Sequence, residues 1–293
     1  MIKDEDVEFH ETDAAQPNWA ETNYFGFFNA EARLNVGVYG LFRPNLGIVG
    51  STICINSGFA NAPWEADFID MQSSLPQPQS LRHYKLNNSL EVECTRPNMD
   101  WTIKYDDGEG TTINVDYKAI MLPFDIQDPD MDPMKAKALA QAENAGNFAW
   151  GTAYNGHFDQ SGHFKGRVTV RGKEYPIDCV STMDHSWGPR PERGAPNMSW
   201  LHAHFSKDLA IHAIFSFDPE ENGANPLRDT GGILAAPLRS IGAGGASGIG
   251  IASAASLSDE FLGFLYHAGF RRFSAQSAGA DLVGVRLVRL SKE

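Results

Sequence analysis

Apolar and polar residues alternate along much of the chain, and a period of two is typical of strands with one buried face. The clearest runs are Leu34–Val38, Leu90–Cys94, Trp101–Tyr105, Ile113–Tyr117 and Phe164–Val170, and the pattern returns between Trp200 and Phe217. Turn-forming clusters such as Asp106–Gly108 and Asn155–Gly156 separate these runs. Strands joined by short turns, without a helix between each pair, predict a mainly β protein whose antiparallel sheets close into barrels or sandwiches.

One helix is predicted near the middle of the chain. Asp132 suits the N-cap position and Pro133 the first helical position, and the residues that follow are rich in Ala, Lys, Leu and Gln. A helix at this place would connect two β-domains. We therefore expect an N-terminal β-domain, a connecting helix and a C-terminal β-domain, with the helix at 132–145 and the two domains at 1–150 and 151–293.

The last quarter of the chain has a different composition, because Gly, Ala and Ser dominate residues 231–256. Such residues are too small and flexible to build much of a core. The stretch Gly244–Gly250 is similar to a dinucleotide-binding loop, but too little chain follows it to supply the further βαβ units that such a site needs. We therefore reject a nucleotide site and expect only a short helix capped by Ser258 and a final strand near 282–290.

Composition narrows the possible functions. The chain has 24 basic and 37 acidic residues, a formal charge of −13. This balance argues against nucleic-acid binding through a basic face and against docking on anionic membranes. Three separated cysteines without a C-x-x-C pair argue against a disulfide framework and favour a reducing cytoplasm. The acidic N-terminus does not resemble a signal peptide, and no apolar run is long enough to span a membrane.

The segment Asp184–Arg190, with the sequence Asp-His-Ser-Trp-Gly-Pro-Arg, combines several groups that could carry chemistry. Asp184 could orient or tune His185, whose ordinary pKa near 6.5 suits proton transfer at neutral pH. Trp187 offers a π-face to a substrate or a developing cation, and Arg190 could hold an anionic oxygen. The alternative is a buried structural turn, with the Trp in the core and an Asp–Arg pair.

A second polar group is expected on a β-hairpin. Alternation places Trp200, His202 and His204 on one face of a strand. If Ser206–Asp208 forms the hairpin loop, His202 lies opposite His212 on the return strand. These residues would then share one surface and are candidates to bind substrate, with His202 as a further catalytic group.

Metal binding and covalent catalysis are not expected. Three histidines on a hairpin resemble the ligands of a zinc ion. No carboxylate that could hydrogen-bond to these histidines is visible in the sequence, so no bound metal is predicted. The sequence has no G-x-S-x-G elbow, and no cysteine has a histidine nearby. In the N-terminal segment Trp19–Tyr24, Glu21 is a candidate acid–base group and Tyr24 a candidate substrate contact. An exposed carboxylate before a strand is the simpler interpretation of Glu21.

Four stretches together resemble the hydroxyneurosporene synthase (carotenoid 1,2-hydratase)-like superfamily, and most of all its lipocalin-like bacterial members. They are Trp19-x-Glu21, Phe42–Gly47 (Phe-Arg-Pro-Asn-Leu-Gly), Gly156-x-Phe158 and Asp184–Arg190, whose D-H-x-W-G core is the most specific. The resemblance covers residues 15–218. It implies two lipocalin-like antiparallel barrels side by side, with a hydrophobic pocket that reaches the D-H-x-W-G motif.

The same resemblance implies addition of water to, or elimination from, hydrophobic molecules without a cofactor. His185 and Trp187 match motif positions that the family uses in catalysis. The family's further catalytic acid, on a later strand, has no obvious equivalent here, which argues for a smaller isoprenoid, a steroid or a lignin-type aromatic in place of a carotenoid. The sequence thus predicts a cofactor-free lyase or hydratase, with a homodimer as a plausible assembly. The alternative is a lipocalin-like carrier that binds a hydrophobic ligand without converting it.

Overall fold

The computed structural model describes residues 2–12, 16–58, 62–128, 130 and 155–190, together with the backbone of four later strands between residues 197 and 252. The chain divides into two compact units. The first contains residues 1–127 and 152–192, and the second contains residues 128–151 and 193–293. Each unit is described by itself below.

The first unit is an antiparallel sheet of eleven strands in the described residues. The strands follow the order β4-β3-β2-β1-β11-β10-β8-β7-β6-β5, and β9 pairs with β10. Their bounds are β1 Trp19–Asn29, β2 Leu34–Arg43, β3 Ile48–Ser57, β4 Phe68–Pro76, β5 His83–Lys85, β6 Glu91–Arg96, β7 Asp100–Asp106, β8 Thr112–Ala119, β9 Phe124–Asp125, β10 Gly156–Val170 and β11 Lys173–Pro189.

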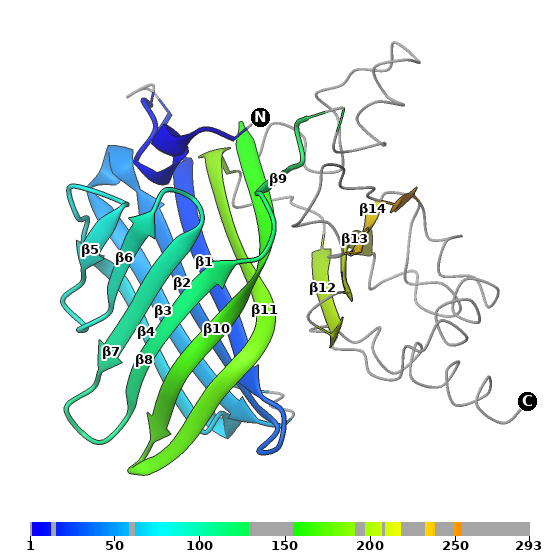
Figure 1. The fold of residues 1–293 in the computed structure, drawn as a ribbon. Coiled ribbons are helices and arrows are strands. Elements are labelled where there is room, and N and C mark those ends of the chain that lie inside the picture. Colours follow the sequence, from blue (N-terminus) through cyan, green and yellow to red (C-terminus); the bar gives the residue numbers. More distant parts are fainter. Residues whose placement is uncertain are drawn as a thin grey trace, which may run out of the picture. The chain divides into compact units, whose positions relative to one another are not determined.

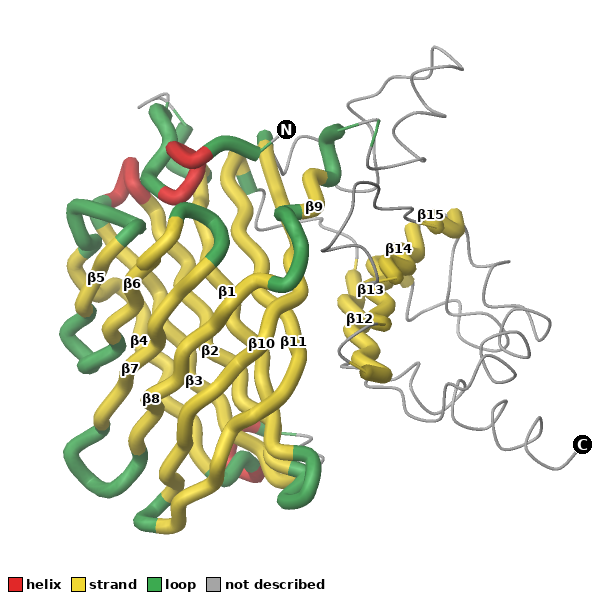
Figure 2. Tube along the Cα trace, in the orientation of Figure 1, coloured by secondary structure: helices red, strands yellow, loops and turns green. Residues whose placement is uncertain are grey.

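The sheet curls so that β5–β8 face β1–β4 across an apolar interior (Figure 1 and Figure 2). Aromatic rings fill the space between the two halves. Phe25 of β1 packs edge-on against Trp101 of β7, with 5.6 Å between ring centroids, and Phe42 of β2 packs against Tyr84 of β5 at 5.2 Å. Curling therefore turns one face of a single sheet into the core, as the alternating sequence requires.

The mainly β, antiparallel architecture predicted from the alternation is confirmed. Each predicted run coincides with a strand, namely β2, β6, β7, β8 and β10, and the turn cluster Asp106–Gly108 joins β7 to β8. The apolar members of the runs are the buried ones. In β7, for example, Trp101, Ile103 and Tyr105 are buried, whereas Lys104 and Asp106 are exposed.

The division between the units differs from the boundary expected at residue 150. Strands β10 and β11 follow that residue in sequence, yet they pair with β8 and β1 in the middle of the first sheet. The D-H-x-W-G motif therefore belongs to the same unit as the N-terminal strands. Short-range patterns could not reveal this, because strand pairing across a long connection leaves no local signal. The helix expected at 132–145 lies outside the described residues.

The second unit contains an antiparallel sheet in the order β12-β13-β14-β15. Its strands are β12 Asn197–Ser206, β13 Leu209–Phe217, β14 Gly232–Pro237 and β15 Ile249–Ala252. The predicted hairpin register is confirmed, since His202 lies opposite His212. The Gly-, Ala- and Ser-rich segment supplies β14 and β15, more order than its composition suggested, because backbone pairing needs no large side chains. The helix expected after Ser258 and the strand near 282–290 lie outside the described residues.

Residues 2–12, called here the N-terminal segment, cross one end of the curled sheet (dark blue in Figure 1). The segment includes the 3₁₀ turn η1, Asp4–Val7, and belongs to no strand in the described chain. Val7 is buried in the core, and Phe9 packs edge-on against Phe42 at 5.5 Å. The other described 3₁₀ turns are η2 Pro44–Leu46 and η3 Pro63–Glu65. In the described part of the chain, no helix has the length and apolar character needed to cross a membrane.

Candidate functional site

The D-H-x-W-G motif lies within strand β11, and alternation along this strand divides its residues between two faces of the sheet. His185 and Trp187 lie on the face that carries Asn23 and Glu21, because β1 pairs with β11 so that Glu21 is opposite Trp187 and Asn23 is opposite His185. Asp184 lies on the other face. The motif is therefore not the structural turn considered above, and Asp184 does not face the imidazole that it was expected to tune.

Glu21 is the carboxylate that faces the interior beside His185. Its side chain is 0% exposed, in contrast to the exposed position expected before the first strand. Three donors surround the carboxylate. The backbone N–H of His10 donates to Oε1 at 2.8 Å, the ring Nδ1 of His10 lies 3.0 Å from Oε2, and the indole Nε1 of Trp19 lies 3.3 Å from Oε1. Both carboxylate oxygens therefore have hydrogen-bond partners, which offsets the cost of burying this polar group.

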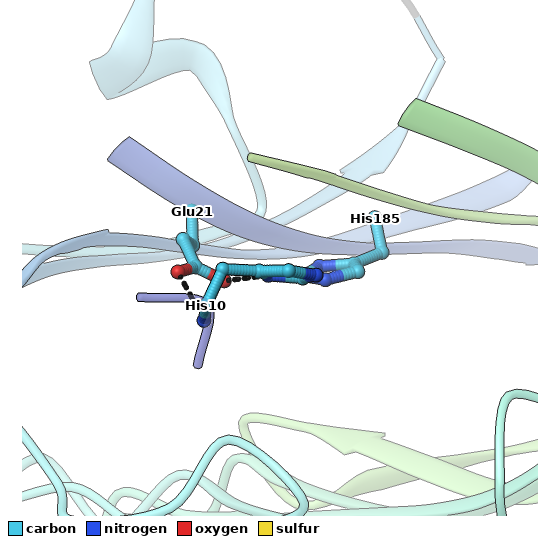
Figure 3. A group of neighbouring side chains, drawn as sticks. All are labelled: His10, Glu21 and His185. Atoms are coloured by element: carbon cyan, nitrogen blue, oxygen red, sulfur yellow. Dashed lines mark hydrogen bonds and ion pairs between the residues drawn. The ribbon is translucent and has the colours of Figure 1, made fainter. Parts of the chain in front are cut away.

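His10 reaches the site from the N-terminal segment (Figure 3). Its ring stacks on Trp187 with 4.0 Å between centroids and lies 6.0 Å from the ring of His185. Its second nitrogen, Nε2, lies 3.4 Å from Oδ1 of Asp6. No pattern in the sequence singles out His10, because an isolated histidine in a polar N-terminal stretch carries no local signal of a contact with a distant strand.

His185 is 1% exposed. Its Nδ1 lies 2.7 Å from the backbone carbonyl oxygen of Thr22, so Nδ1 carries the proton and donates it to that oxygen. The second nitrogen, Nε2, is buried and has no hydrogen-bond partner among the described residues. Burial lowers the pKa of His185 to about 4, although Glu21 and the bond to Thr22 act in the opposite direction. The imidazole is therefore neutral at pH 7, with a free lone pair on Nε2.

Gly156 and Phe158 complete the interior site from strand β10. Gly156 pairs with Trp187, and a Cβ atom at this position would overlap the indole ring. The absence of a side chain at Gly156 thus allows the indole to lie across β10. Phe158 is fully buried and meets the ring of His185 edge-on at 5.7 Å. The G-x-F stretch of β10 therefore packs directly against the rings of His185 and Trp187.

The other face of the same strands carries a second polar cluster. His157 Nε2 lies 3.1 Å from Asp159 Oδ2, and both residues are buried. Burial raises the pKa of Asp184 to about 7, and the Asp159 carboxylate adds to this, whereas His157 and Arg190 oppose it. Burial alone would lower the pKa of His157, but the Asp159 carboxylate outweighs it and the pKa is raised.

Arg190 belongs to this second cluster. Its guanidinium donates to Ser186 Oγ at 2.6 Å and to the Tyr39 hydroxyl at 3.2 Å. Tyr24 lies opposite Asp184 in the β1–β11 register and packs near Tyr39, with ring centroids 6.5 Å apart. Arg190, Asp184 and Tyr24 therefore lie across the sheet from His185 and Trp187. A shared site for these motif residues was predicted, but strand alternation separates them.

The remaining sequence candidates lie in the second unit. Trp200, His202 and His204 are residues of β12, and His212 is a residue of β13. Their side chains lie outside the described part of the structure. Of the ten predicted site residues, the interior site thus brings together Glu21, His185 and Trp187. It adds His10, which lies beside Glu21 and His185 (Figure 3).

The interior site also contains a set of side chains that could hold a metal ion. One ligand atom each from His10, Glu21 and His185 lies within 4.8 Å of the other two. Two imidazoles and a carboxylate are a donor set that suits Zn²⁺ and related ions. Trp187 covers the cluster from the side, since its ring lies 5.1 Å from that of His185.

The solved structures that are similar to this chain include the following three. A Nitrosomonas europaea protein that carries the name AttH matches with a TM-score of 0.52 and 9% identity, over 85% of this chain and 71% of that one. Kievitone hydratase from Nectria haematococca matches with a TM-score of 0.39 and 17% identity, over 76% of this chain and 66% of that one. CghA matches with a TM-score of 0.44 and 9% identity, over 75% of this chain and 57% of that one. The chain therefore spans less than two thirds of the length of these last two proteins. At such identities the first match shows a shared fold.

No curated protein matches the chain significantly. A family model does match, and it covers residues 3–235, which include the whole interior site and strands β1 to β13. The chain thus belongs to the family described as Domain of unknown function (DUF7064).

Proposed function

We propose that this protein is a lyase of the hydratase type, which adds water to or removes water from an apolar or aromatic small molecule. The observation that carries the proposal is the buried Nε2 atom of His185, which has a free lone pair and no partner in the described structure, beside the buried carboxylate of Glu21. The resemblance of the D-H-x-W-G motif to the carotenoid hydratase-like superfamily supports the same class of reaction.

The interior site has the groups that such a reaction needs. Removal of water requires a base that takes a proton from carbon and an acid that protonates the departing hydroxyl. His185 Nε2 accepts the proton from carbon. The His10 ring, held by Glu21 at 3.0 Å, donates a proton to the hydroxyl, which leaves as water. Hydration runs through the same steps in reverse, so no oxidant or reductant is consumed.

The surroundings of the site suit an apolar substrate. Phe158 and Met183 are fully buried next to His185, and the wider interior consists of aliphatic and aromatic side chains. A few polar groups within an apolar wall are typical of sites for small hydrophobic ligands. The π-face of Trp187 would contact the substrate or a cationic intermediate. An isoprenoid, a steroid or a lignin-type aromatic fits this description.

A carrier function is the second candidate, and one observation favours it. His185 and Glu21 are almost completely covered, and the stacking of His10 on Trp187 closes the site from the N-terminal side. In a carrier, the motif would hold β1, β10 and β11 together and contribute no chemistry. The two functions therefore differ in whether His185 is needed for conversion of a ligand that binds.

The test is a screen in water enriched in ¹⁸O, with terpenoid, steroid and lignin-type aromatic compounds and mass spectrometry of the products. A hydratase incorporates ¹⁸O into its product. His185→Gln should lower the turnover by about 10²–10⁴-fold, the usual contribution of general acid–base catalysis. The matched control is His163→Gln, which removes an exposed histidine that contacts Asp178. A compound that binds to the wild-type protein but is never converted would favour the carrier.

Homodimer formation and a cytoplasmic location stay predictions from the sequence. Size-exclusion chromatography with light scattering would measure the first, and cell fractionation the second.

A further inference from the structure

We infer that His10, Glu21 and His185 form a binding site for one divalent transition-metal ion of the zinc class. Their ligand atoms lie within 4.8 Å of one another, and they come from three segments far apart in the sequence: the N-terminal segment, β1 and β11 (Figure 3). Two imidazole nitrogens and one carboxylate oxygen form a known first shell for zinc, which binds such groups at about 2.0–2.2 Å.

The buried Nε2 atom of His185 is the first independent observation that points to a ligand. A buried polar atom without a hydrogen-bond partner is rare in proteins and costs free energy. His185 is 1% exposed, and its Nδ1 is already used in the bond to Thr22. A cation held among the ligand atoms of His10, Glu21 and His185, which lie within 4.8 Å of one another, would satisfy the Nε2 atom of His185.

The outer contacts of the three side chains are the second observation. Metal-binding histidines usually donate their other N–H to a carbonyl or a carboxylate, which fixes the ring. His185 donates from Nδ1 to the Thr22 carbonyl oxygen, and the second nitrogen of His10 faces the Asp6 carboxylate at 3.4 Å. Both histidines therefore have the outer partner expected of a ligand.

Glu21 is oriented in a similar way. Its Oε1 atom accepts hydrogen bonds from the His10 backbone and from the Trp19 indole, which leaves Oε2 to face the Nδ1 atom of His10 at 3.0 Å. Two ligands of a tetrahedral zinc ion are about 3.3 Å apart, given bonds of about 2.0 Å. An ion that enters between these atoms displaces the proton on Nδ1, as expected when metals bind histidine.

The donor set also selects the kind of ion. Calcium prefers six to eight oxygen ligands, and magnesium an octahedron of oxygens, so two imidazoles and one carboxylate disfavour both. Borderline ions such as Zn²⁺ and Co²⁺ suit this set. Three protein ligands leave one position of a tetrahedron open to water or to another small ligand.

This inference goes beyond the proposed function and does not depend on it. An ion on Nε2 of His185 occupies the lone pair that the proposed reaction uses to accept a proton. The ion and the substrate proton therefore compete, and we expect the ion-loaded protein to be inactive as an acid–base hydratase. Activity of the hydratase should accordingly survive exhaustive chelation.

The experiment is titration of the chelator-treated, full-length chain with Co²⁺, followed by visible absorption, and with Zn²⁺, followed by calorimetry. We expect one ion per chain and the intense visible bands of tetrahedral Co²⁺. His10→Ala, Glu21→Gln and His185→Gln should each weaken binding by more than the roughly 10–100-fold that loss of an outer-shell partner costs. His163→Gln, at the exposed pair with Asp178, should leave binding unchanged.

Two further measurements complete the experiment: a check that the variants fold, and a test of the histidines of the second unit. Glu21 and His185 are buried, so their variants are compared with the wild type by circular dichroism, and His10→Ala decides the outcome if either fails to fold. His202→Gln and His212→Gln test the alternative ligands of the second unit. The inference is wrong if the wild-type protein binds no stoichiometric ion. It is equally wrong if binding persists in His10→Ala, or is lost only in the His202 and His212 variants.

Discussion

Glu21 illustrates how single residues make the interior site possible. A carboxylate enclosed by an apolar sheet is costly unless donors surround it. Three donors do so here, two from His10 and one from Trp19. They fix the charge at a defined point next to His185, which Thr22 holds through its backbone carbonyl. The site is thus preorganised by contacts that its members make with one another.

Gly156 provides the first prediction at this scale. An added Cβ would overlap the Trp187 ring, so Gly156→Ala must displace the indole from its place against His10 and β10. Overpacking of this kind typically costs about 1–3 kcal/mol. We expect the free energy of unfolding in urea to fall by that amount, with a change in tryptophan fluorescence of the folded state.

The matched control for this substitution is Gly50→Ala, in strand β3. A Cβ atom at Gly50 would have no neighbour closer than 3.8 Å, so the same chemical change should be well tolerated. Equal stabilities of the two variants would show that Trp187 is free to move away from β10, and the packing argument would then be wrong.

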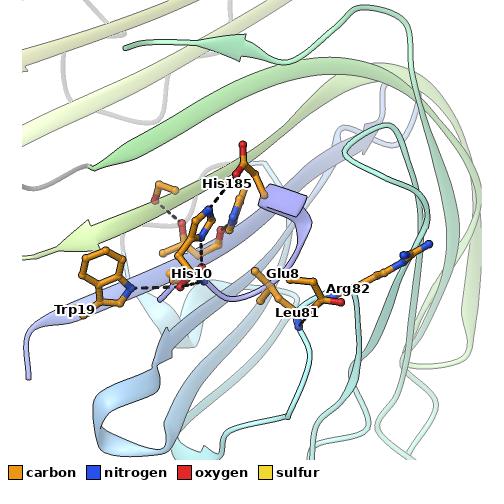
Figure 4. A network of polar contacts seen from close by, with 10 residues as sticks. Glu8, His10, Trp19, Leu81, Arg82 and His185 are labelled. Carbon is orange, nitrogen blue, oxygen red and sulfur yellow. Dashed lines mark hydrogen bonds and ion pairs between the residues drawn. The ribbon is translucent and has the colours of Figure 1, made fainter. Parts of the chain in front are cut away.

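At the scale of elements, the N-terminal segment depends on side chains for its attachment, because it belongs to no described strand. The Glu8 carboxylate accepts hydrogen bonds from Ser80 Oγ at 2.8 Å and from the Leu81 backbone N–H at 3.2 Å (Figure 4). Further along, the backbone N–H of His10 donates to Glu21. The segment is thus tied to the sheet on both sides of the aromatic contact made by Phe9.

Loss of the Glu8 carboxylate should therefore release the segment locally. Hydrogen bonds to charged groups contribute about 1.5–3 kcal/mol, so we expect Glu8→Ala to accelerate amide hydrogen exchange of residues 8–12 by roughly 10–100-fold. Exchange in strand β1 should change little. Mass spectrometry of peptides from the two regions measures both rates.

Glu5→Ala is the control for this prediction. Glu5 lies in the same segment, but its contact is an exposed ion pair with Lys3, which contributes little to stability. If Glu5→Ala accelerates exchange as much as Glu8→Ala does, or if neither variant changes it, the Glu8 contacts do not hold the segment.

At the scale of the whole molecule, the polar cluster on the far face of β10 and β11 should contribute to how stability depends on pH. Asp184 has a pKa of about 7 in the folded state, and the pKa of His157 is also raised. Both groups therefore bind protons more tightly in the folded protein than in the unfolded chain. Asp184 therefore adds to the free energy of unfolding at low pH, and this addition is lost as the pH rises from about 4 to 7. The addition from His157 is lost as the pH rises through the pKa of His157 in the folded protein.

His185, whose pKa is lowered to about 4, has the opposite effect on stability over nearly the same pH range, and it does so in both the wild type and the variant. We therefore expect the difference in the free energy of unfolding between the wild type and Asp184→Asn to shift against the wild type between about pH 4 and pH 7, because an amide does not ionise. A tenfold change in proton affinity corresponds to about 1.4 kcal/mol. The substitution should therefore change the pH-dependent part of the free energy of unfolding by about 1 kcal/mol or more. Urea unfolding at several pH values measures it. Asp116→Asn, at an exposed position of β8, is the control, and identical pH profiles for the two variants would contradict the prediction.

The local sequence determines the strands of the first unit and which side of each strand is buried. Runs such as Trp101–Tyr105 contain this information because side chains alternate between the two faces of a strand. The sequence also singles out His185 and Trp187, through a compact motif, and it sets the register of the hairpin that pairs His202 with His212. Each of these features depends on residues close together in the chain.

Tertiary structure alone decides which of those residues meet. Pairing of β1 with β11 brings Glu21 beside Trp187, and the N-terminal segment adds His10 to the same point. Alternation along β11 places Asp184 on the opposite face from its sequence neighbour His185, together with Arg190. The physical reason is that long-range strand pairing and the curl of the sheet set these distances, and neither leaves a trace in the spacing of residues along the chain.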